Sequence, residues 1–274
     1  MKLFRTRSGN FLEANGNYFK LEATWDSLIA HDDLYGHAAA IAASAPRSTE
    51  FHESEILAPV VSQEIWASGV TYYRSRNARM EESKDAGGGT FYDRVYTAER
   101  PELFFKSTGP KAVGTGAPVR IRKDATWSVP EPEMTLVLSP RGKIIGFTIG
   151  NDMSSRDIEG ENPLYLPQAK VYNGACAVGP CIFLSNGLLP TSTTISIEIL
   201  RDGQPAFTGA TALTELKRDP HTLAEYLFRE MDFEHGALLM TGTGVVPPDN
   251  FTLASGDEII ITIDHIGTLK NTVA

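Results

Sequence analysis

The sequence contains the stretch Trp127-Ser-Val-Pro-Glu-Pro-Glu-Met-Thr-Leu-Val-Leu-Ser-Pro-Arg-Gly-Lys-Ile-Ile-Gly-Phe-Thr-Ile-Gly-Asn-Asp152, whose pattern is typical of a β-hairpin. Two apolar runs, at residues 134–138 and 144–149, flank the turn-forming triplet Pro140-Arg-Gly142. Three acidic residues lie at the open end of this hairpin, away from the turn.

The register of the hairpin decides whether these acids meet. Glu131 and Glu133 are two residues apart, so their side chains share one face of the strand. Pairing that is symmetrical about the turn places Glu133 opposite Ile149. It also places Glu131 opposite Asn151, so that Asp152 emerges beside the two glutamates.

Three carboxylates so close together would repel one another unless a cation lay among them. A ligand set made only of oxygen atoms, without Cys or His, suits Mg²⁺, Mn²⁺ or Ca²⁺ rather than structural zinc. An acidic, solvated face of the hairpin is the competing interpretation. Pro132 fixes the backbone between the two glutamates, and together with the apolar surroundings it favours a metal site at Glu131, Glu133 and Asp152.

The composition bounds the class of protein. The chain has 274 residues, of which 42% are hydrophobic and 22% charged, as in soluble globular proteins. A formal charge of −9 argues against a nucleic-acid partner, and no apolar run approaches the roughly 18 residues of a membrane span. The N-terminus lacks the apolar core of a secretory signal. Cys176 and Cys181 lie in apolar, Gly-rich segments, so we expect buried free thiols and a cytoplasmic location.

Two domains are expected, a small N-terminal domain at residues 1–58 and a β-rich catalytic domain at residues 59–274. A helix is predicted after Asp219, an N-cap residue that Pro220 follows. Helical spacing is also predicted at residues 25–43, with an interruption around Gly36. Strands are predicted at residues 1–4, 17–21, 64–70, 103–105, 119–121, 134–138, 144–149, 177–184, 194–200 and 258–263.

Several motifs resemble those of the fumarylacetoacetate hydrolase family. The matching pieces, in the family's order, are Pro101-Glu-Leu-Phe-Phe-Lys106, Glu131-Pro-Glu133, Gly150-Asn-Asp-Met-Ser-Ser-Arg-Asp157, Thr241-Gly-Thr-Gly-Val-Val246 and residues 255–271. The resemblance implies an α+β, β-rich fold, in which a mixed β-roll catalytic domain follows a small N-terminal domain. It also implies Mg²⁺ or Mn²⁺ at the three carboxylates, a small anionic 2-keto acid or a diketone as substrate, and a homodimer or homotetramer.

One departure from the family concerns the catalytic base. Family members that hydrolyse carbon–carbon bonds place a His in the loop after the first catalytic strand. This chain has no His between His52 and His221. Because His is the readiest general base near neutral pH, hydrolysis is the weaker interpretation.

A second signature, at residues 155–172, resembles the branch of the family that dehydrates 2-keto-3-deoxy-D-arabinonate. It implies loss of water from such a pentonate to give 2,5-dioxopentanoate, with Lys170 in the active site and Glu102 as its partner in proton transfer. Lys170 would otherwise be an ordinary ion-pairing residue, and Glu102 the solvated start of a strand. Two rivals stay open: a hydrolase or decarboxylase acting on acylpyruvates, diketo acids or oxaloacetate, and a sugar-acid binding module without catalysis.

Four further residues are candidates for binding the substrate. The Gly-rich segment at residues 241–244 offers the N–H of Gly242 and the hydroxyl of Thr243 to a carboxylate, although it also fits a simple turn. Lys106 would contact the substrate or carboxylates that surround the metal ligands, unless it is a surface lysine. Arg76 lies in a charge-rich segment that would close over an anionic substrate, unless that segment is only solvated.

Overall fold

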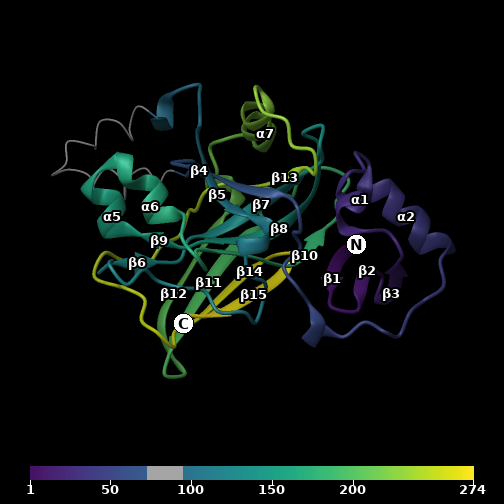
Figure 1. Ribbon diagram of the computed structural model, residues 1–274, viewed down its shortest axis with the longest axis horizontal. Helices are drawn as coiled ribbons and strands as arrows, with labels where there is room; N and C mark the ends of the chain where they lie inside the picture. The colour runs from purple at the N-terminus through teal and green to yellow at the C-terminus, as the bar shows by residue number, and fades with distance from the viewer. Residues whose placement is uncertain (73–94) are drawn as a thin grey trace.

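The computed structural model describes residues 1–72 and 95–274. Its largest element is a nine-stranded sheet in the order β3-β2-β1-β10-β8-β7-β13-β4-β5 (Figure 1). Neighbouring strands are antiparallel except β13 and β4, which are parallel, so the sheet is mixed. The strands are β1 (Lys2–Thr6), β2 (Gly9–Ala14), β3 (Asn17–Leu21), β4 (Glu64–Gly69), β5 (Glu102–Thr108), β7 (Pro132–Leu138), β8 (Ile144–Asp152), β10 (Cys176–Phe183) and β13 (Ala237–Met240).

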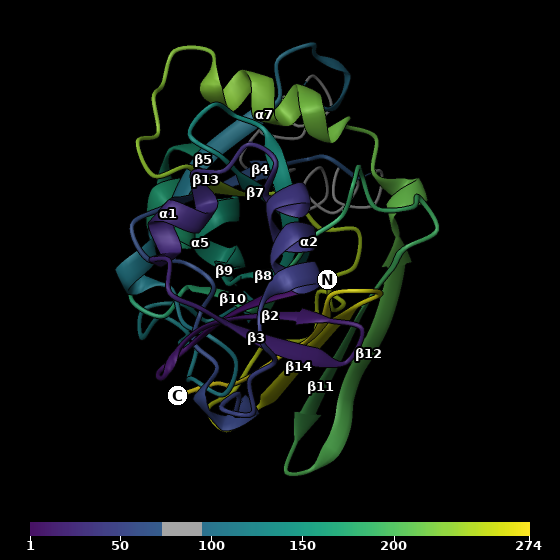
Figure 2. The same cartoon turned by 90° about the vertical axis from the view of Figure 1, so that its right-hand side faces the viewer.

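A four-stranded antiparallel sheet packs on one face of the large sheet. Its order is β12-β11-β14-β15, and Figure 2 shows β11 and β12 as a long hairpin along one side of the molecule. Its strands are β11 (Thr194–Arg201), β12 (Gln204–Ala212), β14 (Glu258–Ile263) and β15 (Gly267–Thr272). Alternate residues such as Ile197 and Ile261 meet Leu136 and Phe147 of the large sheet in one buried cluster. Burial of this apolar surface holds the two layers together.

The N-terminal segment continues the large sheet. Strand β1 pairs with β10, and helices α1 (Trp25–Ile29) and α2 (Leu34–Ser44) contribute to a second apolar cluster, on the sheet's other face. In that cluster Trp25 and Leu34 share a core with Val137 and Leu238. The fold therefore agrees with the expected mixed, β-rich architecture, whereas the domain boundary at residues 58 and 59 stays a prediction.

The helices bounded within residues 95–274 are short. They are α5 (Arg156–Glu161), α6 (Leu166–Lys170) and α7 (Pro220–Phe228), with 3₁₀ turns η1 (Glu53–Glu55), η2 (Gly109–Lys111), η3 (Pro163–Tyr165) and η4 (Leu213–Glu215). Helix α7 confirms the predicted cap, because Oδ2 of Asp219 accepts a hydrogen bond from Thr222 N at 3.0 Å. The predicted interruption around Gly36 is wrong. The helical segment is interrupted between Ile29 and Leu34 instead. Gly36 lies inside α2, where its N–H donates to the N-cap Asp33 at 2.8 Å.

Most of the predicted strands are present, and Asn17–Leu21 and Glu258–Ile263 have the predicted bounds. The strand predicted at residues 119–121 is wrong, since Val119 forms only an isolated bridge with Val273. Strands β2, β12, β13 and β15 were not predicted, and neither was the two-stranded pairing of β6 (Ser128–Val129) with β9 (Ser154–Ser155).

The predicted hairpin of β7 and β8 is confirmed, but its register is wrong at the acidic end. Next to the turn Leu138 pairs with Ile144, as a symmetrical hairpin requires. A β-bulge then shifts the register by one, so that Val137 pairs with Gly146 and Ile145 has no residue opposite it. Glu133 consequently lies opposite Gly150 rather than Ile149.

This one-residue shift determines which side chains face the site. Asp152 N donates to the Glu131 carbonyl at 3.0 Å, so Asp152, and not Asn151, lies across from Glu131. Residues directly opposite in an antiparallel pair share a face, and a slip of one residue turns every side chain to the other face. The bulge therefore places Asp152 on the same face as both glutamates.

Candidate active site

The three acidic residues predicted to bind a metal lie together and are buried. One carboxylate oxygen from each of Glu131, Glu133 and Asp152 lies within 4.8 Å of the others, and none of the three residues is more than 4% exposed. Glu131 immediately precedes β7, Glu133 is its second residue, and Asp152 ends β8. A buried trio of carboxylates fits a divalent cation that prefers oxygen ligands, because uncompensated charges of one sign are costly to bury.

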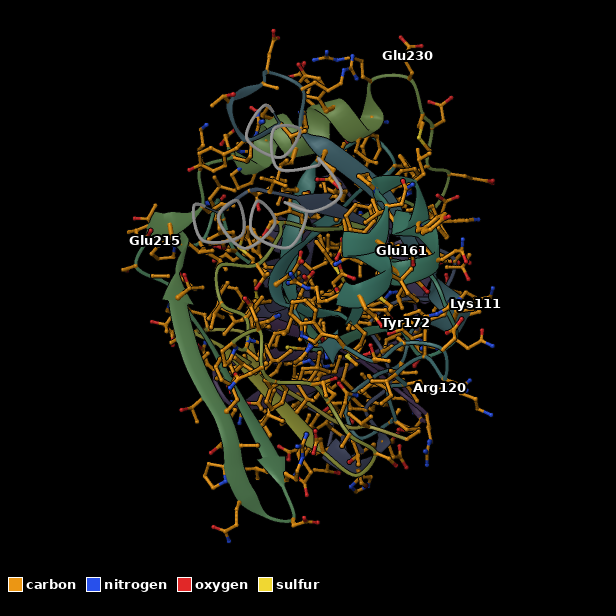
Figure 3. All side chains as sticks on the ribbon, turned by 90° about the vertical axis from the view of Figure 1, so that its left-hand side faces the viewer. Lys111, Arg120, Glu161, Tyr172, Glu215 and Glu230 are labelled. Atoms are coloured by element: carbon orange, nitrogen blue, oxygen red, sulfur yellow. The ribbon has the colours of Figure 1, made fainter. Side chains whose placement is uncertain are left out.

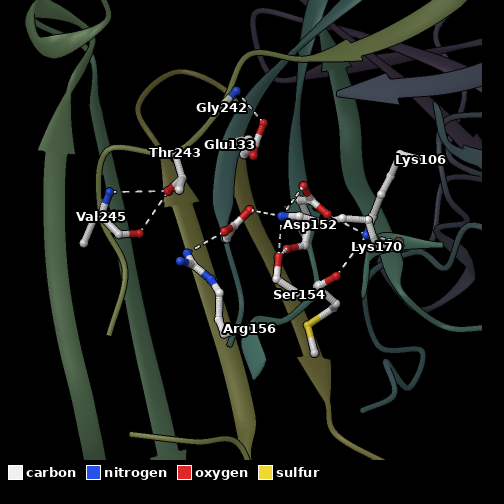
Figure 4. Close-up of polar contacts among 11 residues, drawn as sticks. Lys106, Glu133, Asp152, Ser154, Arg156, Lys170, Gly242, Thr243 and Val245 are labelled. Carbon is white, nitrogen blue, oxygen red and sulfur yellow. Dashed lines mark hydrogen bonds and ion pairs between the residues drawn. The ribbon is translucent and has the colours of Figure 1, made fainter. Parts of the chain in front are cut away.

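Lys170 contacts two of these carboxylates. Its Nζ atom lies 2.5 Å from Glu131 Oε2 and 3.0 Å from Asp152 Oδ2, and it donates to Ser154 Oγ at 2.5 Å (Figure 4). The side chain comes from the last residue of α6 and is fully buried. The ring of Phe104 lies beside it, with its centroid 5.7 Å from Nζ. Lys170 is therefore a buried lysine that is ion-paired with two of the three acids, and its role in proton transfer stays a prediction.

Lys106 is also buried, and its ammonium group is used within the protein. Nζ lies 2.5 Å from Asp152 Oδ1 and donates to the carbonyls of Met153 and Lys170 at 3.0 and 2.6 Å. These contacts join β5, the end of β8 and the end of α6. Lys106 is therefore not a surface lysine, and it contacts Asp152, a predicted metal ligand itself rather than a carboxylate around the ligands.

Arg156, the first residue of α5, is the third cation beside the acids. Its Nη2 atom lies 2.6 Å from Glu131 Oε1, and the residue is 3% exposed. Glu161 ends helix α5, and Tyr172 follows helix α6. Figure 3 shows both residues on the same face of the molecule. The two helices therefore run between the surface and the buried site, and each presents one cation to Glu131.

Glu133 has a different environment from Glu131 and Asp152. Gly242 N donates to Glu133 Oε2 at 2.5 Å (Figure 4). Burial, reinforced by the charges of Asp152 and Glu131, raises the pKa of Glu133 well above its ordinary value in the metal-free protein. A cation among the three carboxylates would oppose this shift, because it stabilises the ionised form.

The segment that follows β13 forms one wall of the pocket above the acids. Gly242, with a φ of +88°, packs so closely on Thr71 that a Cβ atom there would lie 1.9 Å from Thr71 Oγ1. The Thr71 hydroxyl donates to the Thr241 carbonyl at 2.6 Å, which joins this wall to the end of β4. Thr243 lines the pocket and donates to the Val245 carbonyl at 2.9 Å.

Glu102 is connected to the same pocket through its strand partner. It is the first residue of β5 and pairs with Gly69, which lines the pocket together with Phe104, Lys170 and the three acids. Arg76, the remaining predicted site residue, lies outside the described residues.

Three residues that the structure places in the site had no role predicted from the sequence. Ser154 and Arg156 fall within the family motif at residues 150–157, and Gly69 ends the strand before the loop in which the family's hydrolases place a His. The approach of Arg156 to Glu131 depends on where α5 starts, and no local pattern in the sequence fixes that position. Among residues 1–72 and 95–274, no helix has both the length and the apolar character needed to span a membrane.

Comparison with known proteins agrees with this geometry. Residues 65–274 match the family model described as fumarylacetoacetate (FAA) hydrolase C-terminal. Over 224 residues the chain is 46% identical to a probable 2-keto-3-deoxyxylonate dehydratase from Haloferax volcanii, covering 81% of this chain and 76% of that protein. Over 225 residues it is 41% identical to 2-dehydro-3-deoxy-D-arabinonate dehydratase from Saccharolobus solfataricus, with the same coverage of 81% and 76%.

Solved structures extend the similarity to the whole chain. The structure of 2-keto-3-deoxy-D-arabinonate dehydratase complexed with magnesium and 2,5-dioxopentanoate matches with a TM-score of 0.84 and 34% identity, covering 100% of this chain and 98% of that one. A hexagonal crystal form of 2-keto-3-deoxyarabinonate dehydratase matches with a TM-score of 0.87 at the same 34% identity, covering 100% and 99%. From the family match and these identities together, the chain belongs to the fumarylacetoacetate hydrolase family.

Proposed function

We propose that this protein is a magnesium-dependent dehydratase of 2-keto-3-deoxy sugar acids, which converts 2-keto-3-deoxy-D-arabinonate or a similar pentonate to 2,5-dioxopentanoate and water. The observation that carries the proposal is the fully buried Lys170, in contact with both Glu131 and Asp152 inside a pocket. Relatives at 41 and 46% identity are named as dehydratases of such acids, and a solved relative holds magnesium and 2,5-dioxopentanoate.

Glu131, Glu133 and Asp152 would hold the Mg²⁺ ion, for which Mn²⁺ or Ca²⁺ would also fit the oxygen ligands. When bound, the cation acts as a Lewis acid that withdraws electron density from a 2-keto acid and makes its C3 protons more acidic. The three side-chain cations beside these acids belong to Lys106, Arg156 and Lys170. Their positive charge favours binding of an anionic substrate.

Lys170 and Glu102 carry the proton transfers. One of the two removes a proton from C3, and the other protonates the C4 hydroxyl so that it leaves as water, because hydroxide is a poor leaving group. The C3–C4 double bond formed in this way shifts by tautomerisation to give the C5 aldehyde. C4 is reduced and C5 is oxidised within the same substrate molecule. The reaction therefore needs no redox cofactor.

The substrate-binding residues divide into two groups by their contacts. Thr243 lines the pocket, and we propose that its hydroxyl contacts the substrate. Gly242 and Lys106 donate to Glu133 and Asp152, and we propose that they serve the substrate by orienting these ligands. Arg76, which is not among the described residues, keeps its proposed role as a contact for the anionic substrate.

We further propose a cytoplasmic homodimer or homotetramer. Both cysteines, Cys176 and Cys181, are free and buried, which suits a reducing compartment. Burial raises the pKa of each thiol to about 12, so neither is poised to react. Size-exclusion chromatography with light scattering measures the oligomeric state directly.

The test is identification of the product. Purified protein with Mg²⁺ is incubated with 2-keto-3-deoxy-D-arabinonate, and ¹³C NMR is used to follow the reaction. The proposal expects the aldehyde and 2-keto carbons of 2,5-dioxopentanoate, and no turnover after chelation of the metal. Acylpyruvates and oxaloacetate serve as comparison substrates, and release of pyruvate or carbon dioxide from them at a higher kcat/KM would instead support a hydrolase or decarboxylase.

A further inference from the structure

Gly69 and Glu102 are directly paired at the ends of β4 and β5. The Glu102 side chain lies over the backbone of Gly69: a Cβ atom built on Gly69 would be 2.1 Å from Oε2 and 2.4 Å from Cδ of Glu102. The carboxylate thus occupies the space that any other residue's side chain would fill. Gly69 itself lines the pocket that holds the three acids and Lys170.

The neighbours of Glu102 on β5 show that this face of the strand points to the site. Side chains two apart on a strand share a face, so Glu102, Phe104 and Lys106 project together. Lys106 Nζ reaches Asp152 Oδ1 at 2.5 Å, and the ring of Phe104 lies beside Lys170. The contact with Gly69 therefore holds the carboxylate of the half-buried Glu102 on the side of β5 that faces the site.

We infer that Gly69 is a positioning residue, whose missing side chain lets the Glu102 carboxylate lie against the pocket wall. This inference rests on the proposed function of Glu102 in proton transfer. A small displacement of a proton-transfer group has a large effect on rate, because the group must be within hydrogen-bond reach of the proton it moves.

The backbone gives no other reason for a glycine at this position. Gly69 is not among the glycines with a positive φ, whereas the next residue, Val70, has a φ of +53°. Alanine is therefore compatible with the backbone of residue 69. The three atoms nearest to its methyl group would all belong to the flexible end of the Glu102 side chain, so Gly69→Ala should leave the fold intact and move the carboxylate.

Gly36 offers a matched control. A Cβ atom there would lie 2.2 Å from Oδ2 of Asp33, so Gly36→Ala creates the same kind of clash with a carboxylate. Asp33 caps helix α2, in the N-terminal part of the chain, and takes no part in the pocket. Gly36→Ala should lower the melting temperature and leave kcat unchanged.

The experiment is a double-mutant cycle of Gly69→Ala with Glu102→Asp, which withdraws the carboxylate by one methylene group and retains it as a proton carrier. We expect Gly69→Ala alone to lower kcat by about tenfold to a hundredfold, with KM changed by less than about threefold. In the Glu102→Asp background, the same alanine should change kcat by less than about twofold, because the clash is gone.

The outcomes separate the two proposals. If Glu102→Ala leaves kcat unchanged, the role proposed for Glu102 is wrong and the inference about Gly69 falls with it. If Glu102→Ala lowers kcat but Gly69→Ala does not, only the positioning inference is overturned. It is also overturned if Gly69→Ala lowers kcat equally in both backgrounds, since the alanine would then act by another route.

Discussion

Nζ of Lys170 lies 2.5 Å from Oε2 of Glu131, and both side chains are almost completely removed from solvent. A charge-assisted contact of this kind is strong in a buried site, but it is retained only where both partners are held in place. Here the end of α6 supplies the cation, and the residue just before β7 supplies the carboxylate. The same lysine is the proposed proton carrier. Its replacement by an apolar residue therefore removes both the ion pair and the proposed proton transfer.

Lys170→Met is expected to lower kcat by about a hundredfold to ten-thousandfold, because methionine keeps the shape of the side chain but cannot transfer a proton. Steady-state kinetics at saturating Mg²⁺ measure the effect. Lys270→Met serves as the control, since Lys270 is half-exposed and pairs with Glu258 on the small sheet. Near-normal turnover by Lys170→Met would remove Lys170 from the mechanism.

Asp152→Asn is expected to weaken Mn²⁺ binding by at least about tenfold, because the variant loses one of three charged ligands. Electron paramagnetic resonance of free Mn²⁺ gives the Kd without any reliance on activity. Asp124→Asn is the matched control, since Asp124 is exposed and pairs with Arg122 at 2.6 Å. Equal affinities of the two variants would contradict the assignment of Asp152 as a ligand.

Lys106→Met should also alter metal binding, although Lys106 is not expected to touch the metal. The variant leaves Asp152 Oδ1 without its ion pair and two buried carbonyls without a donor. We expect the free energy of unfolding to fall by about 1–3 kcal/mol. The affinity for Mn²⁺ should fall by about tenfold to a hundredfold, as it does when other residues that orient metal ligands are replaced. Urea denaturation and the same resonance titration measure the two effects, and an unchanged affinity would leave Lys106 with a purely structural role.

Glu133 makes the stability of the metal-free protein depend on pH. Burial and the nearby Asp152 and Glu131 raise its pKa in the folded state. The protonated group therefore favours the fold below the ordinary carboxyl pKa of about 4.3, and this contribution is lost as the pH rises through the raised value. Glu133→Gln, which cannot ionise, should melt at a higher temperature than the parent in EDTA at pH 8, and the difference should shrink towards pH 5.

Thermal melts of the two proteins across this pH range provide the measurement. With saturating Mg²⁺ the order should reverse, because only the parent gains stability by binding the metal at all three carboxylates. Melting curves that stay parallel at every pH would show that Glu133 ionises as freely in the folded protein as in the unfolded chain.

The sequence predicted that Glu131, Glu133 and Asp152 would lie together, and they do, but the predicted reason was partly wrong. Symmetrical pairing about the turn would place Asp152 on the face opposite to Glu131. The bulge at Ile145 corrects this, and no apolar pattern could reveal it, because Ile145 is as hydrophobic as the strand residues around it. The apolar periodicity therefore predicted strands β7 and β8. The bulge, which the periodicity does not show, sets the register that brings the three acids to one face.

Long-range contacts were the least predictable part of the site. The burial of Lys170 and Lys106 depends on α6 and β5 meeting at the end of β8, across 64 residues of sequence. The family resemblance pointed to Lys170, whereas its approach to Glu131 and Asp152 became visible only in the structure. The contact of Gly69 with Glu102 is of the same kind, since it requires the exact pairing of two strands.

The trio of acids is tested most directly by locating a metal in the crystal. Crystals are soaked in MnCl₂, and an anomalous difference map is calculated near the manganese absorption edge. The account predicts one strong peak within coordination distance of oxygen atoms from Glu131, Glu133 and Asp152, and its loss after a further soak in EDTA. A map without a peak at these three residues, from crystals of protein that is active with Mn²⁺, would contradict it.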